Sequence, residues 1–406
     1  MKSRMLNFND TEKAFAYKTD QQLKKARFLF GIMQFNGLVK LGTILTPFAL
    51  KIHLPIKGII KNTLFEQFVG GTSLEASSAV ISMLENQKVD VILDYGVEGG
   101  EYDDGRYDAA LEEFVKVIRF AATKKNAPFI SVKLTGLAST KLLSKLNLNA
   151  YEVSEFVSDQ RMNEKLALLD VHEKAAWEKL VKRTEKICSI ASELGLGIMI
   201  DAEETWIQDP IDHIALKMSR KFNQKKSVVY NTLQFYRHDR IAFMQAAYQD
   251  SLDHGYQLAV KIVRGAYMEK ERARAEKLQY RSPIHINKEA VDKDYNEAID
   301  FLIQHHTTCS VIVASHNENS TLKAVQLSIQ ENAQDALHFS QLYGMSDNLT
   351  FNLASDGYHV SKYLPFGPVE EVIPYLLRRA QENSSVAGQT SRELSLIREE
   401  CKRRGI

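Results

Sequence analysis

Eight short runs of β-branched and apolar residues, spaced between residues 89 and 367, limit the possible folds more than any other feature of the sequence. Each run is long enough for a buried strand and too short for a helix of ordinary length. Amphipathic stretches separate the runs, and in one of them Leu111, Val115 and Ile118 share a single helical face. The runs span residues 89–96, 129–134, 196–203, 227–235, 258–267, 310–317, 336–344 and 358–367.

Eight β–α units in roughly 300 residues favour a closed, parallel (β/α)8 barrel. An open doubly wound sheet is the alternative, but no glycine-rich dinucleotide turn follows any of the runs. We therefore expect an α/β protein with a TIM-like barrel at residues 86–390, an N-terminal helical region at 1–85 and a helical tail at 391–406. Residues 142–164 are expected to add helices between the second and third units.

Composition and charge narrow the class of protein. Hydrophobic residues make up 44% of the chain and charged residues 25%, as in ordinary globular proteins. The net charge of +1 gives no reason to expect binding to nucleic acid. Cys188, Cys309 and Cys401 are far apart, which fits a reducing compartment and gives no zinc-binding spacing. Because the first thirty residues show no signal-peptide pattern, a cytoplasmic protein is expected.

The segment from Gln21 to Phe65 has an unusual charge balance. It contains no Asp or Glu and seven Lys or Arg residues. Pro47, Pro55 and the lysines interrupt it too often for a membrane-spanning helix. A basic, apolar segment of this kind can lie on an anionic membrane surface. It can equally form a helical layer on the main domain with its lysines in water, and the sequence leaves both interpretations open.

Polar residues stand near the end of almost every predicted strand. In a barrel the chemistry takes place at the C-terminal strand ends, and an unpaired buried polar group costs roughly 1–3 kcal/mol. Such a pattern therefore indicates a ligand site. Its many donors suit a ligand with phosphates and several acceptor atoms. In chain order the residues are Asp94 and Glu98, Lys133, Asp201 with Glu203 and Glu204, Gln234, Lys261 and Arg264, His316 and Asn317, Gln341, and Tyr363.

Each of these residues also has a purely structural interpretation. The ammonium of Lys133 can simply reach water, and Asp201 can cap the following helix. His316 can be structural. The acids of "DAEE" at 201–204 suggest a hard cation, but consecutive acids on a turn diverge, so no metal is expected.

Two longer stretches resemble one enzyme family. "VKIVRGAYMEKERARAEKLQY" at 260–280 is similar to the flavin-binding segment of proline dehydrogenases. "YLPFGPVEEVIPYLLRRAQENSS" at 363–385 resembles the last strand of that family and the helix over its active site. The likeness covers residues 85–390 and is greatest to single-function enzymes of the mitochondrial type. Shorter motifs follow in the family's order: "SVKLTGL" (131–137), "IDAEET" (200–205), "QFYR" (234–237), "ASHN" (314–317) and "QLYGM" (341–345).

The resemblance implies a proline site. Arg378 and Arg379 would clamp the substrate carboxylate, because a guanidinium matches the two oxygens of a carboxylate. Lys133 would add a third positive charge, and Glu98 would act as a gate over the bound proline. The ring would be lined by Tyr267, Leu342, Tyr363 and Tyr375.

The resemblance also implies FAD as the cofactor. Asp201 would orient Lys133 or Lys261, and these three residues are the expected catalytic groups. Asn287 or Lys288 could contact the ribityl chain or the adenine. The residues expected along the flavin and its pyrophosphate are Ala202, Gln234, Lys261, Arg264, Gly265, Ala266, His316 and Asn317.

By this resemblance the chain would oxidise L-proline to Δ1-pyrroline-5-carboxylate by hydride transfer to FAD. Electrons would then pass to a membrane quinone, which favours peripheral membrane contact by residues 21–65. A Schiff-base aldolase is the alternative, since lysines at barrel strand ends such as Lys133 or Lys261 also form imines with carbonyl substrates. The sequence indicates no oligomeric state.

Overall fold

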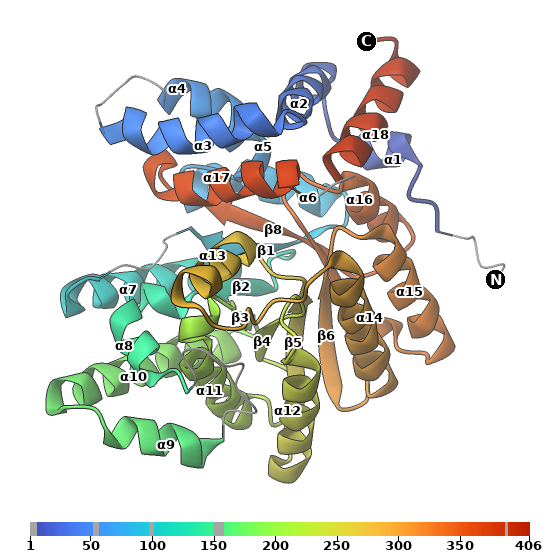
Figure 1. Cartoon of the computed structure of the whole chain (residues 1–406). Coiled ribbons are helices and arrows are strands. Elements are labelled where there is room, and N and C mark those ends of the chain that lie inside the picture. The colour runs from blue at the N-terminus through green and yellow to red at the C-terminus, as the bar shows by residue number, and fades with distance from the viewer. Residues whose placement is uncertain (1–5, 52–56, 97–100, 149–157, 386–388) are drawn as a thin grey trace. The chain divides into compact units, whose positions relative to one another are not determined.

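The computed structural model describes residues 6–51, 57–96, 101–148, 158–385 and 389–406. Eight parallel strands form a closed barrel in sequential order, β1 to β8, which confirms the expected TIM-like fold (Figure 1). Every predicted run overlaps one strand, and only β6 begins outside its run, by one residue. The strands are β1 (Asp90–Tyr95), β2 (Phe129–Val132), β3 (Gly197–Ile200), β4 (Val229–Gln234), β5 (Leu258–Val263), β6 (Cys309–Ala314), β7 (Leu337–Leu342) and β8 (Val360–Phe366).

Helices account for most of the remaining described residues. α1 to α6 precede the first strand, and two of the later helices, α8 and α9, belong to the predicted insert. The helices are α1 (Thr11–Phe15), α2 (Asp20–Met33), α3 (Asn36–Lys51), α4 (Lys57–Ile60), the π-helical turn η1 (Lys61–Phe65), α5 (Glu66–Phe68), α6 (Leu74–Asn86), α7 (Asp104–Ala121), the 3-10 turn η2 (Leu134–Gly136), α8 (Thr140–Leu146), α9 (Asp159–Ala167), α10 (Val171–Glu193), α11 (Thr205–Phe222), α12 (Arg240–His254), α13 (Met268–Leu278), α14 (Lys288–Gln304), α15 (Glu318–Gln330), the 3-10 turn η3 (Gln334–Ala336), α16 (Asp347–Ser355), α17 (Val369–Ser385) and α18 (Gln389–Arg404).

The chain divides into two compact units. Unit 1 comprises Met1–Val97 with Ser340–Ile406, and unit 2 comprises Glu98–Phe339. The domain boundaries expected at residues 85 and 390 stay a prediction. In the described part of the chain, no helix combines the length and the hydropathy needed to cross a membrane.

Unit 2 contains the parallel ladder from β2 to β6. Ser131 lies opposite Met199, and Thr232 lies opposite Lys261, so the register brings neighbouring strands to a common edge. α14 and α15 lie side by side next to β6 (Figure 1). Local capping fixes the helix starts; for example, Asp170 and Glu173 form a reciprocal capping box at the start of α10.

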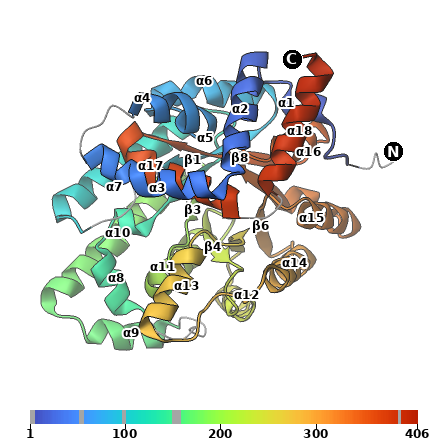
Figure 2. The same ribbon diagram turned by 45° about the horizontal axis from the view of Figure 1, so that its top comes forward.

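Unit 1 is formed by the N-terminal and C-terminal parts of the chain. β1 pairs with β8, α3 runs along α17, and α18 packs on α2 (Figure 2). Its apolar core combines Phe15 and Phe30 with Leu376 and Ile397, from segments more than three hundred residues apart in the sequence. The N-terminal helices therefore depend on the C-terminal helices for a buried face.

A buried ionic cluster ties the same unit together. The ammonium of Lys362, on β8, lies 2.9 Å from a carboxylate oxygen of Asp347 and donates to the carbonyl of Met345 at 2.6 Å. The hydroxyl of Tyr17 donates to Asp347 at 2.7 Å. Because ions buried without partners are costly, this cluster fixes the turn between β7 and α16.

Gly344, in that turn, has the left-handed φ of 79°, and a Cβ atom there would lie 2.0 Å from the carbonyl oxygen of Gln67. We expect Gly344→Ala to lower the free energy of unfolding by more than about 3 kcal/mol, since both backbone strain and a backbone clash result. Gly357→Ala is the matched control, because its φ is 88° and its Cβ position is open. It should cost only about 1–2 kcal/mol. Urea unfolding measures both, and equal losses would contradict the crowded turn.

Candidate active site

The candidate site of unit 2 is built around one buried carboxylate. Asp201 follows β3, and its carboxylate accepts a hydrogen bond from the ammonium of Lys261 on β5 and one of 2.5 Å from the hydroxyl of Ser131 on β2. The ammonium of Lys133 lies 3.8 Å from the same carboxylate. Three strands thus bring two cations to one anion, and the orienting of Lys133 or Lys261 by Asp201 stays a prediction.

Burial and charge act in opposite directions on Asp201. Burial alone would raise the pKa of its carboxyl, but Lys261, Lys133 and the hydrogen bonds outweigh burial and lower the pKa to about 2. Asp201 is not the N-cap of the next helix, because the N-cap residue of α11 is Glu204 and the backbone N–H of Thr205 donates to the side chain of Glu271 at 2.7 Å. The structural interpretation of Asp201 as a helix cap is therefore wrong.

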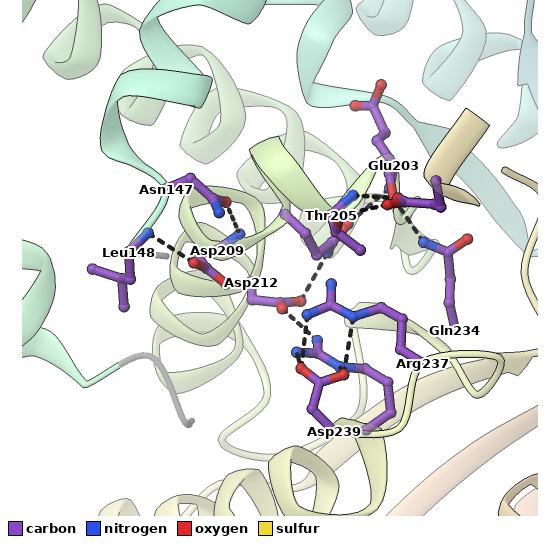
Figure 3. A network of polar contacts seen from close by, with 12 residues as sticks. Asn147, Leu148, Glu203, Thr205, Asp209, Asp212, Gln234, Arg237 and Asp239 are labelled. Atoms are coloured by element: carbon purple, nitrogen blue, oxygen red, sulfur yellow. Dashed lines mark hydrogen bonds and ion pairs between the residues drawn. The ribbon is translucent and has the colours of Figure 1, made fainter. Parts of the chain in front are cut away.

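A second buried acid lies two residues further along. Glu203 accepts hydrogen bonds from the hydroxyl and the backbone N–H of Thr135 at 2.6 and 3.2 Å. Its carbonyl accepts from the side-chain amide of Gln234 at 2.7 Å (Figure 3). Burial raises the pKa of Glu203 to about 7, against the effect of the Thr135 hydrogen bonds. Glu203 is thus a buried group that can hold a proton near neutral pH.

The turn after β5 forms a close backbone approach. Gly265 has a φ of 132°, and a Cβ atom there would lie 2.5 Å from the ring of Tyr236. The backbone N–H of Ala266 donates to the side-chain oxygen of Gln234 at 3.3 Å. Only glycine fits the position of Gly265 without strain.

Arg264, beside this turn, has its guanidinium fixed from several sides. It donates to Asp292 at 2.8 Å, to Ser315 at 2.8 Å and to Ser320 at 2.9 Å. Its guanidinium also lies 4.2 Å from the ring centre of Tyr295. A guanidinium held in this way offers a preorganised positive charge.

The remaining predicted cofactor residues of unit 2 occupy strand-to-helix turns. Ala202 and His316 are half-buried after β3 and β6. The side chain of Asn317 accepts from the N–H of Ser320 and so caps α15, and Asn287 caps α14 in the same way. These caps are structural roles that the strand-end pattern did not reveal.

A further network supports the turn after β4 and was missed by the sequence analysis. Arg240 donates to Asp212 at 2.8 Å and also to Asp239, and Asn231 donates to Asp212 at 2.9 Å. Arg237 binds Asp239 through two nitrogens at 3.0 and 2.7 Å (Figure 3). The alternating charges of "RHDR" at 237–240 are the one sequence signal that pointed to it.

Five of the predicted proline-binding residues lie in unit 1, and the predicted gate residue Glu98 is outside the described residues. Leu342 ends β7, and Tyr363 lies in the middle of β8, not at its end. Tyr375 and Arg379 lie one helical turn apart on α17, with the guanidinium 5.2 Å from the ring centre. Arg378 is half-buried beside them, whereas Arg379 is 7% exposed. Unit 2 carries Lys133 and Tyr267.

The residues of unit 2 fit a flavin nucleotide. The Gly265 turn allows a ligand close to the backbone, and Lys261, Arg264 and Gln234 supply donors and positive charge for the carbonyl oxygens and nitrogens of the flavin ring and for phosphates. One nitrogen of the buried Arg237, Nη1, has no hydrogen-bond partner among the described residues, so it can serve an acceptor of a ligand. Those residues include no cluster of three or more His, Cys, Asp or Glu side chains that could hold a metal ion.

A parallel barrel with a buried, charged constellation at its strand ends defines an enzyme of the barrel class. The family model described as proline dehydrogenase matches residues 78–392, and this chain belongs to that family of enzymes.

The chain is similar to several curated proteins. It is 32% identical to the carbapenem antibiotics biosynthesis protein CarD of Pectobacterium carotovorum over 83% of both chains. It is 33% identical to the mitochondrial proline dehydrogenase 2 of Arabidopsis thaliana, covering 85% of this chain and 79% of that one. The solved structure of proline utilization A from Bdellovibrio bacteriovorus shares the fold with a TM-score of 0.68 at 18% identity. The match covers 94% of this chain and 37% of that longer protein.

The raised pKa of Glu203 has a measurable consequence for stability. A carboxyl whose folded pKa is raised from 4.5 to about 7 contributes stability that is present below pH 4.5 and lost as pH rises through 7. Glu203→Gln mimics the protonated form and does not titrate. The free energy of unfolding of the variant minus that of the wild type should therefore rise by roughly 3 kcal/mol from pH 4.5 to pH 8. Urea unfolding across this pH range tests the sign. A difference that stays constant with pH contradicts it.

Proposed function

We propose that this chain oxidises L-proline to Δ1-pyrroline-5-carboxylate, with FAD as its cofactor and a quinone as the electron acceptor. Membership of the proline dehydrogenase family supports the reaction class. The structural feature that most supports the proposal is the buried group of Asp201, Lys261 and Lys133. It provides fixed positive charge at the strand ends of a barrel.

The substrate carboxylate is bound by Arg378, Arg379 and Lys133 in this proposal. Guanidinium groups form forked hydrogen bonds to a carboxylate. The ring of Tyr375 under the Arg379 guanidinium supports that side chain through a cation–π contact. Tyr267, Leu342, Tyr363 and Tyr375 line the apolar ring of proline, which suits a small-ligand site with few polar groups.

The cofactor is held in this proposal by residues from the ends of β3, β4, β5 and β6. When bound, FAD supplies the acceptor for the hydride that leaves C5 of proline. Asp201 is a positioning residue, since it holds Lys261 and Lys133 through its carboxylate. The cofactor-binding residues proposed are Ala202, Gln234, Lys261, Arg264, Gly265, Ala266, His316 and Asn317.

The overall reaction balances with bound FAD as the acceptor of the hydride. Proline would bind with a neutral amine, C5 would lose a hydride, and the ring nitrogen would release its remaining proton to water as the C5–N double bond forms. The protein contributes orientation, by holding the carboxylate, and a positive environment around the acceptor.

A Schiff-base aldolase is the competing proposal. Imine formation needs a free, neutral amine, whereas Asp201 engages the ammonium groups of both Lys261 and Lys133. Borohydride treatment with candidate aldehydes separates the two functions. Covalent reduction at either lysine would favour the aldolase.

The carboxylate clamp is tested by Arg379→Met. With a soluble dye as acceptor, kcat/KM for proline should fall more than tenfold, corresponding to about 1.4 kcal/mol or more of lost binding energy in the transition state. Arg398→Met is the matched control, because Arg398 is an exposed arginine on α18, and it should leave kcat/KM within twofold. A fall of less than tenfold for Arg379→Met means that the clamp is misassigned.

We also propose that unit 1 contacts an anionic membrane surface through α2, α3 and α4. Half of the exposed large apolar side chains of the described chain lie here, among them Phe35 at 62% and Leu38 at 56% exposure. The surrounding segment from Gln21 to Phe65 carries lysines and no acidic residue. Apolar side chains among basic ones complement an anionic bilayer surface.

Vesicle sedimentation tests this contact. Wild-type protein should bind vesicles rich in phosphatidylglycerol more tightly than neutral vesicles, and salt should weaken the binding. Phe35→Glu combined with Leu41→Glu should reduce the bound fraction at least fivefold. Ile286→Glu, at another exposed apolar residue, should not change it. Equal binding of wild type and the double variant would contradict the assignment.

A further inference from the structure

Unit 1 contains a cavity that the proposed proline and flavin sites do not use. It has a volume of about 290 Å³ and lies among α2, the π-helical turn η1, α5, α6 and the turn after β7. Single π-helical turns are rare and occur frequently at functional sites. The size is near the lower end for small-ligand sites and matches one substituted ring.

The walls of the cavity differ in chemistry. Phe28, Leu29 and Met83 form an apolar side, and Lys18 and Asn62 bring donors from the other elements. A ligand with a flat apolar ring and acceptor oxygens satisfies both sides. A ligand without an apolar face would leave this wall without favourable contacts.

The positive charges of the cavity are already balanced. The ammonium of Lys25 lies 2.8 Å from Glu66, and that of Lys18 lies 3.8 Å from the buried Asp347. A phosphate or carboxylate ligand would therefore have to compete with fixed carboxylates. The cavity therefore favours a neutral ligand whose oxygens accept hydrogen bonds.

The mouth of the cavity continues into the exposed apolar surface of α2 and α3. Phe28, which lines the cavity, is 67% exposed, and Ile32 and Phe35 follow at 37% and 62%. Phe28 and Ile32 lie one turn apart on α2, and Phe35 follows in the link between α2 and α3. A hydrophobic tail attached to the ring can lie along this row towards the proposed membrane contact.

The floor of the cavity belongs to a fixed turn. Tyr343 lines the cavity and directly follows Leu342, a proposed proline-lining residue. The amide of Gln67, another lining residue, donates to the carbonyl of Gly344 at 2.7 Å. The turn itself is held by Lys362 through the carbonyl of Met345. A ligand here would contact a rigid surface that continues into β7.

We propose that this cavity binds the head group of an isoprenoid quinone, with its tail along Phe28, Ile32 and Phe35. The inference rests on the proposed function. In the overall reaction proline loses one hydride and one proton, and one quinone takes up the equivalent two electrons and two protons to become a quinol, with bound FAD as the carrier of the electrons. Lys18 and Asn62 would donate hydrogen bonds to the quinone oxygens.

Two variants that fill the cavity test the assignment, Met83→Trp and Val80→Trp. With proline and a short-chain quinone, kcat/KM for the quinone should fall at least tenfold. With proline and a soluble dye, kcat/KM for proline should stay within twofold. Ser82→Trp is the matched control, because Ser82 is an exposed residue of α6 outside the cavity lining. It should change neither value.

Binding is measured separately with a photoreactive azido-quinone. In the wild type the label should map to peptides from α2 or α6, and an excess of unlabelled quinone should protect them. In Met83→Trp this labelling should be lost.

Normal quinone kinetics in both tryptophan variants would overturn the cavity assignment while leaving proline oxidation intact. Equal loss with dye and quinone in those variants would also overturn it. A wild type that oxidises proline with neither acceptor would instead refute the proposed function, and labelling outside the elements that line the cavity would refute the cavity on its own.

Discussion

A carboxylate that is buried and yet ionised determines the arrangement of the candidate active site. Removing an ion from water costs several kcal/mol unless partners replace the solvent. Asp201 finds those partners in Lys261, Lys133 and Ser131, which come from β5 and β2. Since β2 to β5 form one ladder, the register of the barrel sets the position of each charge. The polar strand ends are therefore a property of the fold as much as of the individual residues.

Unit 1 also contains a buried ion pair, and there it stabilises a turn. Lys362 and Asp347 form a buried ion pair, and Tyr17 adds a hydrogen bond from the N-terminal segment. The pair holds the turn between β7 and α16, next to Leu342 and Tyr343. Leu342 is proposed to contact proline, and the next residue, Tyr343, is proposed to contact the quinone ring. The contacts of Tyr17 and Lys362 with Asp347 hold the N-terminal segment and β8 at this turn.

The local sequence was sufficient to predict the strands but not the contacts between them. Seven strands lie inside predicted runs and β6 begins one residue before its run, because β-branched apolar residues are a local signal. The run at 196–203 was too long, since the chain leaves β3 after Ile200 and turns Asp201 towards Lys261. The Arg240–Asp212 pair and the crowding of Gly344 by Gln67 join residues 28 and 277 positions apart. Such pairs depend on register and on tertiary packing, which no local pattern encodes. The site residues of α17 were singled out only through family resemblance.

The central claim is that a flavin held at the strand ends of this barrel takes electrons from proline. The most direct measurement is the visible absorption spectrum of the purified protein, supplied with FAD and titrated with proline in the absence of oxygen. The account predicts a bound flavin whose oxidised absorption disappears in proportion to added proline. A folded protein that retains no FAD, or whose bound flavin keeps its oxidised spectrum in excess proline, would contradict it.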